Sequence, residues 1–229
     1  MLKYKKAKHL DAWLFHVNHL LRNISMKIFV HYLCLEKLLN TESSTNKKVL
    51  TKIEKKNIQN QRNFYLKEFL HTDKPINITE DRYGKPYAID YPHLCFNQSH
   101  SQSFYALVYN KQNVHVGVDI EDFSRSIHMD ALAKRYFHVE EVKKWEEMGK
   151  SKKIWLKIWT IKEAVLKAHG LGIRLSLKSL NTNIDDRSNT GMVKHEQLGL
   201  FRYQCFDMKS SMMTIAYQDL GMDAEIVFK

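Results

Sequence analysis

A period of two in the apolar residues marks the strands of this chain. The segment "VHVGVDIE" (114–121) places four β-branched residues on one face and two carboxylates, Asp119 and Glu121, on the other. Residues two apart on a strand are roughly 6.5–7 Å apart at Cα, so these like charges repel each other. The same pattern predicts further strands at 10–17, 201–206, 212–217 and 224–228.

Apolar residues spaced three and four apart predict helices instead. The clearest is 152–169, where Ser151 offers an N-cap and Gly170 a C-terminal stop. Its apolar stripe is expected to face a core. This stripe comprises residues 154, 155, 158, 161, 165 and 168. The other predicted helices are 25–39, 49–70, 128–137 and 139–149.

The segments between these elements are predicted to be turns and loops. Residues 39–49 are polar and without periodicity, which favours an exposed loop, and 81–101 are expected to form ordered turns with short extended pieces. The polar Asn-Lys-Gln-Asn turn at 110–113 separates two strand-like runs, 103–109 and 114–121, and predicts a β-hairpin. Helices alternating with mostly antiparallel strands indicate an α+β fold, with a possible duplication into two halves.

Composition narrows the partners. The 229 residues carry a formal net charge of +11, which favours partners that are negatively charged. A hydrophobic content of 44% argues against a disordered chain. Three distant cysteines fit a reducing cytoplasm, and we expect neither a signal peptide nor a membrane span because charged and polar residues interrupt each apolar run.

Four short patches concentrate unusual chemistry, although each alone has an ordinary explanation. A Gly-Lys-Pro is common in turns, Ser-His-Ser is as often a hydrogen-bonded loop, and Glu163 with Lys167 could be a simple i,i+4 pair. Asp119 and Glu121 could likewise lie on a solvated strand face. The patches are Gly84-Lys85-Pro86, Phe96-Asn97-Gln98-Ser99-His100-Ser101, Gly117-Val118-Asp119-Ile120-Glu121 and Trp159-Thr160-Ile161-Lys162-Glu163-Ala164 with Lys167.

In this order and at these spacings, the four patches resemble the surfactin-synthetase-type 4′-phosphopantetheinyl transferases. A lesser motif of that family, Arg-aromatic-Phe followed by Glu, is met at Arg135–Glu141. The resemblance covers about residues 83–175. It implies two similar α+β halves related by a pseudo-twofold axis, with the active site between them. We expect residues 1–103 to form the half on the nucleotide side and 104–229 the half with the metal and catalytic residues.

The resemblance implies transfer of phosphopantetheine from coenzyme A to a serine of an apo acyl or peptidyl carrier protein, with release of 3′,5′-ADP. Mg²⁺ prefers a few carboxylates together with water and phosphate oxygens. Asp119 and Glu121 share a strand face, and Glu163 would reach them from a helix packed across that strand. We expect Glu163 to be the general base, with Glu141 as a less direct assistant and Lys167 as a second catalytic group.

The remaining expected contacts are with coenzyme A. The family resemblance places Lys85 and Pro86 near the adenine, and His100 could donate to a phosphate oxygen. Lys162 is expected at the rim of the site, about 100° around the helix from Glu163. The full set of expected coenzyme A ligands is Lys85, Pro86, Ser99, His100, Lys162 and Lys167. Candidates for the 3′-phosphate are Lys55, Lys56, Arg62 and Lys67.

Two other function classes remain open at this stage. A metal-dependent phosphohydrolase or nuclease would use the same acids and lysines, and a basic nucleic-acid-binding protein would use the lysines alone. The transferase hypothesis predicts a cytoplasmic monomer whose partner is an acidic carrier protein. It predicts that neither nucleic acid nor a membrane is a partner. Lysines near Gly149 are candidates for steering that carrier: Lys143, Lys144, Lys152 and Lys153.

Overall fold

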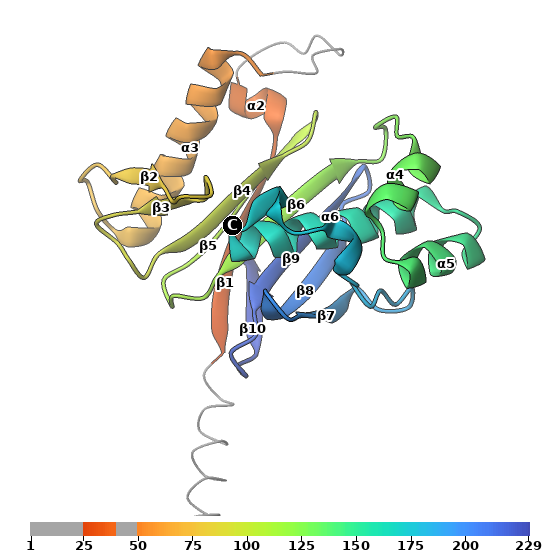
Figure 1. Ribbon diagram of the computed structural model, residues 1–229. Coiled ribbons are helices and arrows are strands. Elements are labelled where there is room, and N and C mark those ends of the chain that lie inside the picture. The colour runs from red at the N-terminus through yellow and green to blue at the C-terminus, as the bar shows by residue number, and fades with distance from the viewer. Residues whose placement is uncertain (1–24, 40–49) are drawn as a thin grey trace, which may run out of the picture.

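The structure is a computed structural model that describes residues 25–39 and 50–229 (Figure 1). The strand expected at 10–17 and, apart from Leu39, the loop expected at 39–49 lie outside the described residues. None of the helices in the described part has the length and apolar character needed to cross a bilayer.

The fold is α+β, as predicted, with two sheet-containing bodies. The first body has a four-stranded sheet in the order β10-β1-β5-β4, and the second has one in the order β6-β9-β8-β7. The strands of the first sheet are β1 (Met26–Cys34), β4 (Cys95–His100), β5 (Phe104–Asn110) and β10 (Ala224–Phe228). Those of the second are β6 (Val116–Asp122), β7 (Thr190–His195), β8 (Gly199–Asp207) and β9 (Ser211–Gln218). A separate two-stranded hairpin joins β2 (Ile78–Glu80) to β3 (Pro86–Ala88).

The helices cover the outer faces of the sheets. Figure 1 shows α3 (Lys52–Leu70) beside the first sheet and α6 (Lys152–His169) across the second. Buried side chains form one core between α3 and the first sheet, one between the two sheets, and one between the second sheet and its helices. The smaller helices are α2 (Leu35–Leu39), α4 (Met129–Tyr136) and α5 (Val139–Glu147), with two 3-10 turns at Gly172–Arg174 and Leu177–Ser179.

The long helices begin and end near the predicted residues. The α3 helix opens with a capping box in which Thr51 and Glu54 satisfy each other's backbone amides. The α6 helix ends at Gly170, whose φ of 97° belongs to the left-handed region that glycine favours. The predicted strands at 201–206, 212–217 and 224–228 are confirmed as β8, β9 and β10, whereas β7 was not predicted.

The helix predicted at 25–39 is wrong. Residues Met26–Cys34 form β1, which pairs in parallel with β10 and antiparallel with β5, and only Leu35–Leu39 are helical. Met26, Ile28 and Val30 are buried at alternate positions, which is the period of a strand. Pairing with a segment about 200 residues away decides this element, and no local pattern contains that information.

The predicted hairpin between β5 and β6 is also wrong. The β5 strand pairs with β1 and β4, and β6 pairs with β9 in the other sheet. The buried Asn110 shapes the crossing, because its side chain donates to the carbonyl of Val114 and accepts from the amides of Gln112 and Val114. The asparagine therefore stabilises a change of sheet. The first sheet contains two strands, β5 and β10, that follow residue 103 in the chain. The division of the chain into the halves 1–103 and 104–229 stays a prediction.

Candidate active site

A glycine brings α6 unusually close to β6. A Cβ added at Gly117 would lie 2.2 Å from the carbonyl oxygen of Ala164 and 2.4 Å from the amide nitrogen of Ala168. Both atoms belong to the helix backbone, so no side-chain rotation could relieve the clash. The missing side chain thus lets Glu163 and Lys167 face the strand that carries Asp119 and Glu121. The alternating pattern of residues 114–121 predicts one buried face for this strand. In the structure α6 covers the other face as well, so β6 is buried on both sides.

Asp119 lies at the centre of the site and is only 5% exposed. Its Oδ1 accepts from the Lys167 ammonium at 2.6 Å and from the Ser99 hydroxyl at 3.1 Å. The Lys167 ammonium also donates to Ser99 at 2.9 Å. The three side chains come from β6, α6 and β4, so the structure brings both bodies together at this point.

Two further carboxylates complete an acidic cluster with Asp119. Burial raises the pKa of Glu121, the charge of Asp119 raises it further, and Arg125 opposes both. Burial also raises the pKa of Glu163, with Asp119 adding to the rise and Lys167 reducing it. Arg125 forms an ion pair with Glu121, and this partner was not predicted from the sequence. The charge of Asp119 thus acts on both glutamates, which is the electrostatic effect expected of neighbouring acids.

The residues of the cluster suit a divalent cation in their chemistry. Asp119 Oδ2 is buried and has no hydrogen-bond partner within the described residues, although its twin oxygen has two. A buried, unpartnered carboxylate oxygen is costly and is a ready ligand. Within 25–39 and 50–229, no three His, Cys, Asp or Glu side chains are grouped closely enough to enclose an ion by themselves. Mg²⁺ commonly takes one or two carboxylates and completes its shell with water and phosphate oxygens, so its binding does not require three grouped side chains.

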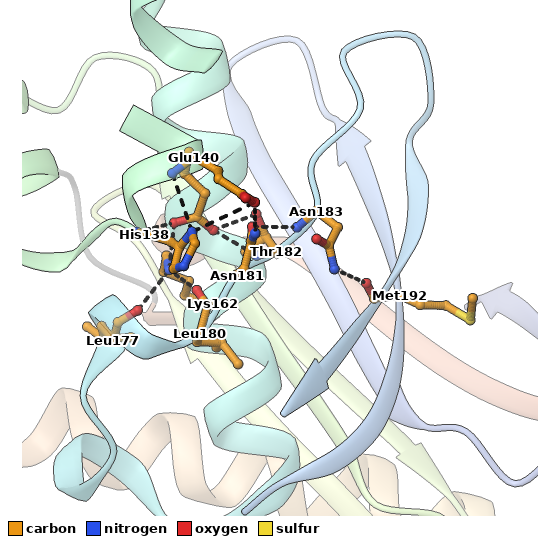
Figure 2. Close-up of polar contacts among 10 residues, drawn as sticks. His138, Glu140, Lys162, Leu177, Leu180, Asn181, Thr182, Asn183 and Met192 are labelled. Atoms are coloured by element: carbon orange, nitrogen blue, oxygen red, sulfur yellow. Dashed lines mark hydrogen bonds and ion pairs between the residues drawn. The ribbon is translucent and has the colours of Figure 1, made fainter. Parts of the chain in front are cut away.

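Lys162 and Glu141 form a different site. The expectation that Lys162 lies at the rim is wrong, because the residue is 0% exposed and pairs with Glu141 at 2.7 Å. Figure 2 shows the Lys162 ammonium donating to the carbonyl oxygens of Leu177 and Leu180 as well. Burial lowers the pKa of Lys162, and Glu141 opposes that shift.

Glu141 is 1% exposed, and its hydrogen-bond and ion-pair partners belong to this buried network. Its carboxylate accepts from the amide and hydroxyl of Thr182 and from the amide of His138, where it completes the capping box of α5. These contacts tie α5, α6 and the 177–182 segment together. Glu141 therefore stabilises the packing of these segments, and it does not belong to the acid cluster around Asp119.

Lys85 joins the β2–β3 hairpin to the end of α6. Its ammonium donates to the carbonyl of Ala168, and burial lowers the pKa of Lys85 to about 8, against the opposing charges of Cys95 and Asp81. The turn that presents it has Gly84 at φ 87° and is closed by Asp81, which accepts from the Lys85 amide at 2.9 Å. Pro86 follows as the first residue of β3. Both residues lie at the junction of the bodies, and their contact with coenzyme A stays a prediction.

The other expected phosphate ligands lie on the first body. His100 is exposed at the end of β4, one residue after Ser99. Lys55 and Lys56 are exposed on α3, whereas Arg62 is 7% exposed and its guanidinium lies 5.6 Å from the centre of the Phe96 ring. Arg62 is therefore the least accessible of the four candidates for the 3′-phosphate.

The lysines proposed to steer a carrier do not form one free patch. Lys144 donates to the carbonyl of Ile184, and Lys152 to that of Arg125 at 2.6 Å. Lys153 pairs with Asp207 at 2.6 Å. Lys143 has only a loose partner, Glu147 at 3.9 Å on the same helix. The set is thus divided among different partners.

Sequence comparisons agree with the geometry of the site. Residues 115–215, which carry Asp119, Glu121, Glu163 and Lys167, match the 4′-phosphopantetheinyl transferase superfamily. This match confirms the resemblance predicted from the motifs.

The chain is also similar to several curated 4′-phosphopantetheinyl transferases. It is 38% identical over 84 residues to the 4′-phosphopantetheinyl transferase HetI of Nostoc sp., covering 35% of this chain and 34% of that protein. It is 30% identical over 111 residues to Sfp of Bacillus subtilis, covering 48% of each. It is 31% identical over 121 residues to gsp of Aneurinibacillus migulanus, covering 52% of this chain and 47% of that protein. The chain thus spans at most about half the length of these relatives.

Proposed function

We propose that this protein transfers 4′-phosphopantetheine from coenzyme A to a serine of an apo acyl or peptidyl carrier protein. The observation that carries the proposal is the meeting of Asp119, Glu163 and Lys167 with Ser99, because it joins acids, a cation and both sheet bodies at one point. The relatives are named 4′-phosphopantetheinyl transferases, and the segment that matches the superfamily, residues 115–215, contains the acid cluster.

Mg²⁺ would draw its carboxylate ligands from Asp119, Glu121 and Glu163, with the unpartnered oxygen of Asp119 as one of them and with water and phosphate oxygens completing its shell. When bound, the ion would neutralise charge on the pyrophosphate as its bridging bond breaks. The carboxylates that now repel one another would then share a counter-charge. This explains why a chain with a net charge of +11 places three acids together.

The cations of the site would bind the phosphates. The side chain of Lys167 is 29% exposed, so its ammonium can meet a phosphate oxygen while it keeps its bond to Asp119. His100 is exposed beside Ser99 and can donate from its ring. Lys85 and Pro86 would approach the nucleotide from the β2–β3 hairpin.

Glu163 is our candidate for the general base. The serine hydroxyl of the carrier would attack the β-phosphorus, its proton would pass to the Glu163 carboxylate directly or through a water, and the P–O bond to 3′,5′-ADP would break. Glu141 is not assigned a part in this step, because its carboxylate is enclosed by Lys162, Thr182 and the amide of His138.

The basic chain suits an acidic carrier as partner, in a cytoplasmic setting and with the enzyme as a monomer. The test is incubation of the protein with coenzyme A, MgCl₂ and a panel of apo carriers, followed by mass spectrometry of the carriers. We expect one carrier at least to gain the mass of one phosphopantetheine arm. No gain on any acyl or peptidyl carrier, with the nucleotide products still formed, would instead support a phosphohydrolase.

A further inference from the structure

The strands β4 and β6 lie side by side without a backbone ladder between them. Each pairs with a strand of its own sheet, β4 with β5 and β6 with β9. Side chains of alternate residues on β4 make the connection instead. Asn97 and Ser99 share one face of β4, since successive side chains of a strand alternate, and Ser101 follows directly after the strand.

The first bridge is made by Asn97, which is 7% exposed. Its Oδ1 accepts from the amide of Val118 on β6 at 3.0 Å. Val118 is 0% exposed, so water does not compete for this amide. A buried amide without an acceptor would be destabilising, and Asn97 supplies the acceptor that a neighbouring strand would normally provide.

The second bridge is made by Asp122, which is 2% exposed at the end of β6. Its Oδ1 accepts from the Ser101 hydroxyl at 2.7 Å, and its Oδ2 accepts from the Ser103 amide at 3.0 Å. The Ser101 hydroxyl in turn accepts from the Phe104 amide, which closes the end of β4 into its turn. The sequence pattern did not single out Asp122, although it follows the two acids of the site directly.

The contact between Ser99 and Asp119 lies between these two bridges. The bridges run from residue 97 to 101 on β4 and from 118 to 122 on β6, so they fix both strands over the same length and in the same direction. If either strand slid, Ser99 would lose the carboxylate that it shares with Lys167.

We propose that Asn97 and Asp122 are positioning residues that hold β4 in register with β6, and so hold the two halves of the candidate coenzyme A site together. This inference rests on the proposed function only for its effect on coenzyme A. The effect on strand register follows from the hydrogen bonds alone. Neither residue is expected to touch the reacting atoms.

The test uses the full chain with Asn97→Leu, Asp122→Ala and Asp122→Asn. The matched control is Thr182→Val, which removes a buried hydroxyl bond to Glu141 inside the second body. Residue-resolved amide hydrogen exchange and the kinetics with coenzyme A are measured for each. We expect exchange at Val118 in Asn97→Leu, and at Ser103 in Asp122→Ala, to be about tenfold faster than in the control at matched global stability.

For the reaction, we expect the KM for coenzyme A to rise about fivefold in Asn97→Leu and Asp122→Ala, with kcat changed less. Asp122→Asn keeps an acceptor for the Ser103 amide. Compared with Asp122→Ala, it should therefore show slower exchange at Ser103 and a smaller rise in the KM for coenzyme A. An unchanged KM at a stability loss equal to that of Thr182→Val would show that the bridges are merely structural. If Asn97→Leu fails to fold, the two Asp122 variants decide.

A wild-type protein that does not transfer phosphopantetheine would refute the proposed function without touching the exchange measurement. In that case, equal protection of Val118 and Ser103 in the wild type and the variants would overturn the role in strand register. Faster exchange confined to the β4–β6 junction would support it.

Discussion

The two long helices each cover a four-stranded sheet, but they differ in how much of their surface is buried. Twelve of the 18 residues of α6 are buried, and its backbone touches β6 at Gly117. Only four of the 19 residues of α3 are buried, and Lys55 and Lys56 face outward. The close contact positions the acid cluster, whereas the looser one leaves a basic surface.

This difference teaches how the site is built. The second body supplies rigid geometry, because Asp119, Glu121, Glu163 and Lys167 project from a strand and a helix held in backbone contact. The first body contributes through its edge, where Ser99 reaches Asp119 and Lys85 reaches the end of α6. Changes at the α6–β6 backbone contact should therefore act on fold and chemistry together, and changes in the first body on affinity or stability alone.

The largest effect is expected from Gly117→Ala. The added methyl group would meet the backbone of α6, and overpacking against backbone should cost about 3 kcal/mol of unfolding free energy. Urea denaturation measures the stability and the carrier assay measures the transfer, which should fall with it. Gly191→Ala is the control, because its methyl group would meet the Tyr203 side chain at the outer strand. Equal losses in the two variants would remove the special status of the α6–β6 contact.

Glu163→Gln should separate chemistry from fold in the second body. We expect transfer to fall at least about a hundredfold, because a metal ligand and base is lost. The unfolding free energy should change by less than about 1 kcal/mol, because the variant relieves repulsion among acids. The exposed Glu147→Gln is the matched control and should keep full activity. Removal of Mg²⁺ by EDTA should reproduce the loss in the wild type, and MgCl₂ should restore it.

The basic surface of α3 is tested by the double variant Lys55→Ala/Lys56→Ala. If these lysines bind the 3′-phosphate of coenzyme A, its KM should rise about fivefold, as expected for two exposed charges worth up to about 1 kcal/mol together. The KM for dephospho-coenzyme A should not change. Lys178→Ala/Lys194→Ala removes two exposed lysines from the second body as the control. A similar change in the KM for coenzyme A and for dephospho-coenzyme A would show that the two lysines of α3 do not bind the 3′-phosphate. They would then act only through their positive charge on any anionic ligand.

The smallest effect is expected from His31 in the first body. Its ring stacks on Tyr65, and Nε2 lies 3.0 Å from the Tyr109 hydroxyl. Burial lowers the pKa of His31 to about 4, with Lys229 contributing. The folded state therefore binds fewer protons than the unfolded state between about pH 6.5 and 4, so stability should fall as pH falls through that window.

His31→Phe should remove about 1 kcal/mol of that pH dependence, after allowance for the partial exposure of the ring. Urea denaturation at pH 7 and pH 4.5 measures it, and transfer at pH 7 should be unaffected. The exposed His128→Gln is the control and should leave the slope as it is. An unchanged slope in His31→Phe would show that other groups cause the acid sensitivity.

The sequence predicted the second body better than the first, for physical reasons. The α6 helix carries its own signals, namely an apolar stripe, Ser151 before it and Gly170 after it, and the acids share a strand face by alternation alone. The β1 strand has no such local signal, because its pairing with β10 joins the two ends of the described chain. The bridging hydrogen bonds of Asn97 and Asp122 could not be predicted from the sequence either, because they depend on how the two sheets pack.

The burial of Lys162 shows the same limit on a smaller scale. Helical spacing placed it about 100° from Glu163, which is correct for an isolated helix. The 177–180 segment then covers that side and supplies carbonyl oxygens, so the ammonium is enclosed instead of lying at a rim. Helical spacing alone cannot predict which distant segment will pack over a given side of the helix.

The acid cluster at the junction of the two bodies is proposed to transfer phosphopantetheine from coenzyme A to a carrier. The most direct measurement is the release of 3′,5′-ADP from coenzyme A by the wild type with MgCl₂, followed with and without an apo carrier. We expect 3′,5′-ADP to appear only with the carrier, in an amount equal to that of the modified carrier, and not with Glu163→Gln. Release at the same rate without a carrier would contradict it and identify the site as one that hydrolyses the pyrophosphate.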